Sequence, residues 1–162
     1  MTSHAPPRIF SRQLVIGDWT GTLALSLRGA GAEVDEHDAA SLDEERPLDG
    51  GPYDLIVSLG SLDRVNDLPG ALLHLRNALA DDGLMIASFP GAGSLPHLRR
   101  SMLAAEPDRP AARMHPLIDN QAAAGLLQRA LFKRQVVDSH TLTVSFGGLH
   151  RLVSDLRDQG LG

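Results

Sequence analysis

The sequence predicts a three-layer α/β fold with a mostly parallel sheet of about five or six strands. Its central stretch, residues 53–90, alternates strand, helix and strand, and the apolar run Leu55–Val57 suits a strand that is covered on both faces. Residues 14–28 give a strand, a glycine turn and a helix. The apolar content is 43% but the aromatic content is only 4%, so we expect an aliphatic core between the sheet and its helices.

The chain of 162 residues has the length of one domain. Two prolines and small polar residues near the start predict a loose N-terminal segment over residues 1–12. Residues 13–162 are expected to fold as a single domain, and no internal repeat divides them.

The first part of this domain is predicted to contain two strands joined by a helix. Leu14–Ile16 forms the first strand and enters a glycine turn at residues 17–21. Leucines at 23, 25 and 27 predict a helix that ends at Arg28, because glycines follow it. Residues 33–37 form the second strand, and the acidic, turn-rich stretch 39–52 is expected to stay irregular.

The central stretch is predicted to form a right-handed crossover between two parallel strands. Asp67 caps its helix, Pro69 occupies the first turn, and an apolar stripe runs to Leu79. Gly83 ends the helix, and residues 84–89 form the next strand. Ligands of open α/β sheets bind beyond the carboxyl ends of the strands, so the loops at 58–63 and 90–94 are expected to face the site.

The last third is predicted to contain three helices and a hairpin. Ser94 caps the first helix, which is expected to turn Leu95, Leu98, Met102 and Leu103 inward. Asp119 or Asn120 caps the second, with Ala123, Leu126, Leu127 and Ala130 spaced for burial. Val136–Val137 and Leu142–Val144 are expected to pair as a hairpin, and an amphipathic helix over 149–156 is expected to pack on the sheet.

Composition excludes several classes of function. The absence of cysteine excludes disulfides and thiolate metal sites, and no two of the seven histidines have the i, i+4 spacing of a helical metal pair, so we expect no metal. The net charge of −5 argues against nucleic acid as a partner. No signal peptide and no apolar run of about 20 residues is visible, which predicts a cytoplasmic protein without membrane contact.

Several stretches carry a family resemblance. They are Tyr53–Ser58, Val65–Leu72, Leu79–Leu84, Gly125–Ala130 and Val136–Asp138. With them the chain resembles the class I S-adenosylmethionine-dependent methyltransferases, and among these the bacterial relatives of the mitochondrial complex I assembly methyltransferase-like factor. The resemblance implies a Rossmann-like sheet that is truncated here, because residues 39–52 are too few for the family's usual helix and third strand.

The resemblance also implies a site for S-adenosylmethionine. The family's loop Leu-Asp-Ile-Gly-Cys-Gly-Thr-Gly falls on Leu14–Gly21, where Val15 replaces the acid and Trp19 replaces the middle glycine. An indole at that position is expected to fill the site. Asp38 matches the acid that accepts hydrogen bonds from the ribose. The implied cofactor-binding residues are Gly17, Asp18, Trp19, Gly21, Asp38, Ser58, Leu59 and Gly60.

Structural alternatives stand beside these roles. A glycine turn between strand and helix is also needed for chain reversal alone, and Asp38 can instead be a solvated turn residue. The His-Trp or Gln-Trp pair of the relatives appears here as Asp63-Arg64, so the catalytic residues are unknown.

Two hypotheses for the function therefore remain open. The first is a methyltransferase with an unknown small-molecule or protein acceptor. The second is a pseudoenzyme, a non-catalytic binding or assembly module that has lost the cofactor. In both, an exposed sheet edge predicts a homodimer.

Overall fold

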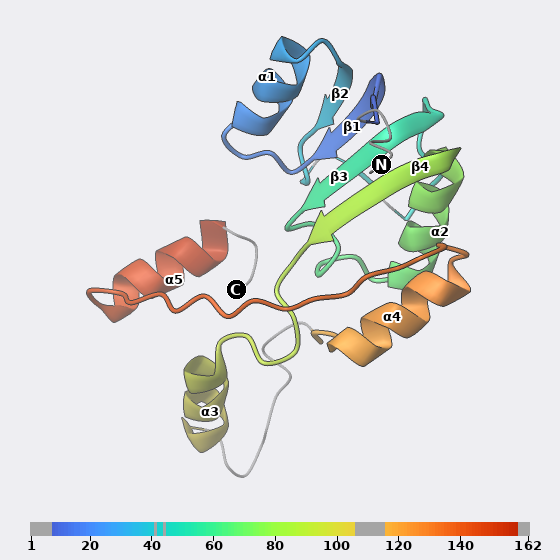
Figure 1. The fold of residues 1–162 in the computed structure, drawn as a ribbon. Helices are drawn as coiled ribbons and strands as arrows, with labels where there is room; N and C mark the ends of the chain where they lie inside the picture. Colours follow the sequence, from blue (N-terminus) through green and yellow to red (C-terminus); the bar gives the residue numbers. More distant parts are fainter. Residues whose placement is uncertain (1–7, 41, 44, 106–115, 159–162) are drawn as a thin grey trace, which may run out of the picture.

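The computed structural model describes residues 8–40, 42–43, 45–105 and 116–158. These residues form a four-stranded parallel sheet rather than the five or six strands expected, and its order is β2-β1-β3-β4 (Figure 1). The strands are β1 (Arg12–Ile16), β2 (Glu33–His37), β3 (Tyr53–Leu59) and β4 (Leu79–Ser88). Because the strands are parallel, the carboxyl ends of all four lie at the same end of the sheet.

Five helices accompany the sheet: α1 (Thr22–Gly29), α2 (Leu68–Ala78), α3 (Pro96–Ala105), α4 (Asn120–Arg129) and α5 (Leu149–Asp158). Figure 1 shows α1 beside β1 and β2, with α2 and α4 together at the other side of the sheet. Helices α3 and α5 lie beyond the carboxyl ends of the strands. None of the helices in the described ranges is long and apolar enough to cross a membrane.

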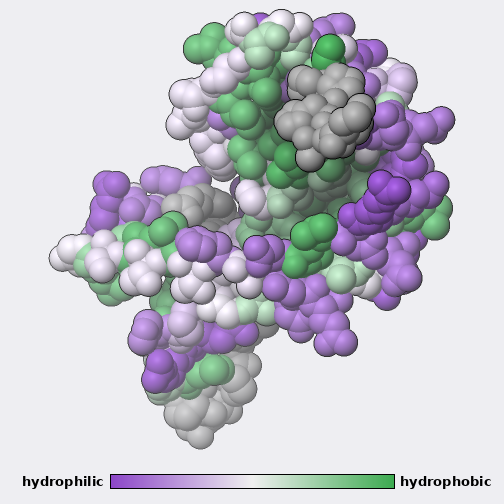
Figure 2. Space-filling view, in the orientation of Figure 1, coloured by the Kyte–Doolittle hydropathy of each residue, from purple (hydrophilic) through white to green (hydrophobic). Residues whose placement is uncertain are grey.

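The core lies between the two central strands and α2. Leu14, Ile16 and Ile56 are at most 1% exposed, and Leu72 and Leu75 of α2 pack in the same cluster. The aliphatic core that the composition predicts is thus confirmed. In the view of Figure 2, hydrophobic residues gather over the sheet, while hydrophilic residues dominate the right-hand rim.

The boundary between α2 and β4 differs from the prediction. Asp67 caps α2 as expected, accepting a hydrogen bond from the Gly70 amide at 3.0 Å, but the helix ends at Ala78 rather than near Gly83. Leu79 is extended, 6% exposed and paired with Tyr53, whereas Leu55 pairs with Leu84. Leu79 therefore reaches the core from a strand, and residues 80–83 bulge out of the ladder.

The C-terminal third contains the other corrections. No residue of α3 is buried, and Leu103 is 55% exposed, so its predicted inward face is wrong. Residues 135–146 form no strand, and Val136 and Leu142 are 89% and 78% exposed, so the predicted hairpin is wrong as well. Helix α5 is confirmed, but it does not pack on the sheet (Figure 1).

Polar links join the strands at their amino ends. The carboxylate of Asp54 accepts hydrogen bonds from the amides of Ser11 and Arg12, both at 2.9 Å. The Tyr53 hydroxyl donates to Asp35 at 2.8 Å. Burial, together with this carboxylate, raises the pKa of Tyr53 to about 12. These hydrogen bonds therefore link β1 and β2 to β3 near its amino end.

Candidate functional site

The first turn needs its leading glycine for the fold itself. Gly17 has φ 78°, and its amide donates to the carbonyl of His37 at 3.0 Å. A Cβ at this position would lie 2.2 Å from the carbonyl oxygen of Leu59. Gly17 thus lets β1 turn directly against the end of β3, and this packing requires glycine whether or not a ligand binds.

Asp18 and Gly21 form the entrance to α1. The Asp18 carboxylate accepts hydrogen bonds from the Ala24 amide at 2.9 Å and from Thr20 Oγ1 at 3.3 Å. The Ala24 amide is the main cause that lowers the pKa of Asp18. Gly21 is the N-cap with φ 66°, and nothing lies within 4 Å of a Cβ built on it. The backbone at Gly21 is therefore open to an approaching molecule.

Trp19, whose indole the sequence expects to fill the site, lies exposed on the turn. Its residue is 63% exposed, and it is not among the residues with positive φ. Its amide donates to the carbonyl of Gly17 at 3.0 Å, which closes the turn without the left-handed backbone that favours glycine. The indole therefore lies at the surface of the turn.

Asp38 directly follows β2 and begins a turn. Its Oδ1 accepts from the Ala40 amide at 3.0 Å, and its carbonyl accepts from the Leu42 amide at 3.2 Å. The residue is exposed and lies next to His37, whose carbonyl receives the Gly17 amide. The structure thus places Asp38 beside the glycine turn, in a position that fits both roles left open by the sequence.

The end of β3 supplies the floor of this region. Ser58 is fully buried, and its Oγ lies 2.6 Å from that of Ser61. The Gly60 amide donates to the carbonyl of Ser88 at 2.8 Å, which joins the ends of β3 and β4. Of the three predicted residues of this loop, Leu59 contacts the first turn, through its carbonyl next to Gly17.

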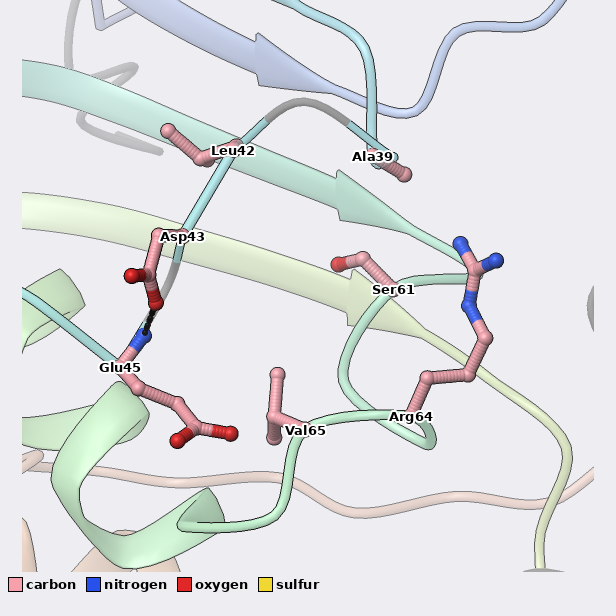
Figure 3. A pocket seen from close by; sticks show the side chains of 7 residues that line it. All are labelled: Ala39, Leu42, Asp43, Glu45, Ser61, Arg64 and Val65. Carbon is pink, nitrogen blue, oxygen red and sulfur yellow. Dashed lines mark hydrogen bonds between the residues drawn. The ribbon is translucent and has the colours of Figure 1, made fainter.

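A first hollow of about 240 Å³ opens between the loops after β2 and β3. In Figure 3, Ser61 and Arg64 lie on one side and Asp43 and Glu45 on the other. Arg64 donates to the carbonyl of Gly60 at 3.1 Å. Sequence reasoning placed the loop at 58–63 at the site but singled out neither Arg64 nor the acids of residues 43–45, although they closely follow Gly60 and Asp38. The lining residues are Ala39, Leu42, Asp43, Glu45, Ser61, Arg64 and Val65.

A second hollow of about 210 Å³ lies between the loops after β3 and β4. Its walls are mainly apolar, but Asp63 lines it and is only 8% exposed. The buried Oδ1 of Asp63 has no hydrogen-bond partner. Sequence reasoning placed Asp63 at the end of a loop expected to face the site and noted it as a departure from the relatives, but gave it no role. The lining residues are Leu62, Asp63, Val65, Asn66, Leu68, Phe89, Pro90, Pro116, Leu117 and Ile118.

Within the described ranges, no group of three or more His, Cys, Asp or Glu side chains could hold a metal ion.

The sequence matches a known family over most of this structure. Residues 11–134 match the family described as "Methyltransferase domain". The chain belongs to this family. The resemblance predicted from residues 53–84 is thereby confirmed, and the four parallel strands are those of a Rossmann-like methyltransferase fold.

Curated proteins of similar sequence include arginine-hydroxylases and a putative methyltransferase. The human "Arginine-hydroxylase NDUFAF5, mitochondrial" is 36% identical over 124 residues, which are 74% of this chain and 35% of the relative. The mouse protein of the same name is 34% identical over 122 residues, or 73% and 36% of the two chains. A "Putative methyltransferase" of Rickettsia prowazekii is 27% identical over 121 residues, or 73% and 54%. The chain thus spans about a third of the mammalian relatives and about half of the bacterial one.

Solved structures share the fold at low identity. A SAM-dependent methyltransferase of Thermotoga maritima superposes with TM-score 0.51 at 19% identity, covering 78% of this chain and 66% of that one. The CurJ carbon methyltransferase superposes with TM-score 0.57 at 20% identity, covering 89% and 46%. At these identities the likeness shows the fold alone.

Proposed function

We propose that this domain binds S-adenosylmethionine at the carboxyl edge of β1, β2 and β3 and serves methyl transfer to an acceptor that is still unknown. The observation that carries the proposal is the open first turn. Gly21 leaves free space above the N-terminus of α1, and the exposed Asp38 follows His37, whose carbonyl accepts from the Gly17 amide at the start of the same turn. The hollow lined by Ser61 and Arg64 begins at Ala39, the residue after Asp38.

The residues present fit the cofactor in size and chemistry. S-adenosylmethionine supplies an electrophilic methyl group on a sulfonium sulfur. In the proposal, the Asp38 carboxylate accepts hydrogen bonds from the ribose hydroxyls, as acids after the second strand do in dinucleotide folds. Gly17 and Gly21 let the turn approach the ligand. Ser58, Leu59 and Gly60 form the floor, and the protein orients the acceptor and excludes water.

The competing hypothesis is a non-catalytic module. It rests on Val15 and Trp19, which replace family residues in the cofactor loop. Val15 is fully buried and offers no polar group, which still favours this hypothesis. Trp19, however, is 63% exposed and lines neither hollow, which weakens its support for this hypothesis. We therefore favour cofactor binding.

Calorimetry with S-adenosylhomocysteine, the demethylated product, tests this choice. The wild type is expected to bind it, and Asp38→Ala to bind at least about tenfold more weakly, since hydrogen bonds to a charged group contribute roughly 1.5–3 kcal/mol. Asp49→Ala is the matched control, because it removes the same charge from an exposed position outside the site. Absence of heat at millimolar ligand would establish the non-catalytic hypothesis.

A second readout uses Trp19, the only tryptophan of the chain. Its emission is expected to change when the ligand covers the turn. Trp19→Gly should bind within a few-fold of the wild type, because the indole lies outside the space that the ligand needs. A gain of more than about tenfold on this substitution would show that the indole obstructs the site after all.

We also propose that two copies of the domain associate through β4. The edge strand β2 carries Glu33, Asp35 and Glu36, so pairing two copies of it would set like charges together. At the other edge, residues 84–88 carry no charge, and Leu84 and Ile86 are 41% and 49% exposed. The uncharged edge is therefore the one suited to pairing.

Antiparallel pairing of two β4 strands about Ile86 gives the side chains of each strand compatible neighbours on the other. It brings the two Ile86 residues together and sets Leu84 opposite Ser88, while Asp82 meets Pro90 rather than another acid. Light scattering at micromolar concentration should give a dimer mass that Ile86→Lys abolishes. Leu73→Lys, which charges an equally exposed apolar residue on α2, should leave the dimer intact. A monomer mass for the wild type would remove the proposal.

For its cellular setting we propose the cytoplasm. A chain without cysteine needs no oxidising compartment. Fractionation of the native cells tests this location.

A further inference from the structure

The second hollow contains a buried acid without a partner. Asp63 is 8% exposed, and its Oδ1 receives no hydrogen bond. Native proteins seldom leave a buried carboxylate oxygen unsatisfied, because the charge loses its water without gaining a donor. Because Asp63 lines a hollow, a bound molecule can supply the donor that the described residues do not.

The described wall residues give Asp63 Oδ1 no hydrogen bond, although Asn66 among them carries a side-chain amide. Phe89 and Leu62 are apolar, and Pro90 and Pro116 have no amide hydrogen. Arg64, the neighbour of Asp63 in the sequence, lines the first hollow instead and donates to the carbonyl of Gly60. Among the described residues, no ion pair neutralises Asp63.

We propose that this hollow binds the apolar end of a molecule that carries a cationic nitrogen, with an N–H of that nitrogen donating to Asp63. A cation matches the carboxylate in charge, and charge-assisted hydrogen bonds of this kind are about twice as strong as neutral ones. The apolar walls select a hydrocarbon or aromatic body beside the charge. An anion is excluded because the carboxylate of Asp63 would repel it.

The volume sets the size of the group that fits. About 210 Å³ equals about seven waters at roughly 30 Å³ each. That is room for one ring or a short alkyl chain with its nitrogen, so the ligand is a small amine or one amine-bearing arm of a larger molecule.

The position of the hollow connects it with the proposed methyl transfer. Val65 lines both hollows, so the loop of residues 61–65 separates them. If S-adenosylmethionine occupies the first, an amine in the second stands on the other side of one loop. Its role as the methyl acceptor rests on the proposed function, whereas its binding to Asp63 does not.

Benzylamine and benzyl alcohol, which share the ring but differ in charge, test the proposal without any cofactor. Each is titrated into the ¹⁵N-labelled protein and followed by amide chemical shifts. Benzylamine is expected to shift amides of residues 62–68, 89 and 117–118 and to bind at least about tenfold more tightly than benzyl alcohol. Equal affinities, or shifts elsewhere only, would overturn the proposal.

Two variants sharpen the assignment. Asp63→Asn keeps the shape but loses the charge and should weaken benzylamine at least about tenfold. Asp43→Asn makes the same change in the first hollow and should bind benzylamine as the wild type does. Unchanged affinity in Asp63→Asn refutes the assignment. If Asp63→Asn fails to fold, the preference of the wild type for the amine over the alcohol still decides.

The outcome is separate from that of the proposed function. A protein that binds S-adenosylhomocysteine but shows no preference for benzylamine loses only the amine site. A protein that binds benzylamine through Asp63 but no S-adenosylhomocysteine keeps the amine site and loses the methyl transfer.

Discussion

Replacing Gly17 with alanine tests whether the first turn requires glycine for packing. A Cβ at Gly17 would lie 2.2 Å from the carbonyl oxygen of Leu59, and φ is 78°. The left-handed backbone costs alanine about 1–2 kcal/mol, and relief of such an overlap costs about 1–3 kcal/mol more. We expect Gly17→Ala to lower the free energy of unfolding by about 2–5 kcal/mol.

Two nearby glycines serve as matched controls. Gly21 has φ 66° but nothing within 4 Å of its Cβ, so Gly21→Ala is expected to lose only the backbone term of about 1–2 kcal/mol. Gly29 ends α1 without positive φ and also has open space. Gly29→Ala should therefore be neutral or stabilise the protein by about 0.5–1 kcal/mol.

Urea unfolding followed by far-ultraviolet circular dichroism measures the series. For a chain of this size, 1 kcal/mol corresponds to about 2–4 °C in Tm, so thermal melts provide a second measurement. Equal losses for Gly17→Ala and Gly21→Ala would refute the role of the Leu59 contact. Full stability of Gly17→Ala with lost binding of S-adenosylhomocysteine would assign Gly17 to the ligand instead.

Three further predictions concern polar links. Tyr53 is the only tyrosine, so its absorbance titration should have a midpoint near pH 12. Because its pKa in the folded protein lies above the usual 10, the stability that Tyr53 contributes is complete below pH 10 and is lost as pH rises towards 12. Tyr53→Phe should therefore reduce the fall of the unfolding free energy over this pH range. Asp67→Ala should cost about 1 kcal/mol of unfolding free energy in urea, and Asp67→Ser much less, because serine still caps α2; equal losses would contradict the cap. Asp54→Ala should lose about 1–3 kcal/mol in the same assay by leaving the Ser11 and Arg12 amides without their acceptor, whereas a loss as large in Asp54→Asn would point to charge rather than the hydrogen bonds.

The central strands were predictable because their signal is local. Leu14–Ile16 and Leu55–Val57 are apolar runs that only a covered parallel strand accommodates, and the structure buries every one of these residues. The helix cap at Asp67 was also predictable, because its hydrogen bond joins residues only three positions apart in the sequence.

The failures all involve partners that lie far away in the sequence. Leu79 continues the helical stripe of α2, but its pairing with Tyr53 draws it into β4. Val136 and Leu142 have strand-like residue types, yet no described strand pairs with them, so residue type alone gave the wrong hairpin. The inward face of α3 failed for the same reason, since none of its residues is buried against the described part of the chain.

The candidate site was predictable only in part. Family resemblance named the turn at 17–21, Asp38 and the end of β3, and the structure brings these together at one edge. It could not name Asp63, whose interest arises from burial and a missing donor, and these are properties of the folded wall. Nor could it orient Trp19, whose exposure depends on the path of the turn.

The amino and carboxyl ends of the strands are far enough apart to be altered separately. Tyr53 and Leu59 stand at opposite ends of a seven-residue strand, which at about 3.3 Å per residue separates them by about 20 Å. Substitutions that far apart add nearly independently in their effects on stability. Exposed loop positions such as Asp43, Glu45 and Asn66 can therefore be varied to seek new ligands, while improvements around Arg12, Asp35 and Asp54 supply the lost stability without touching the ligand.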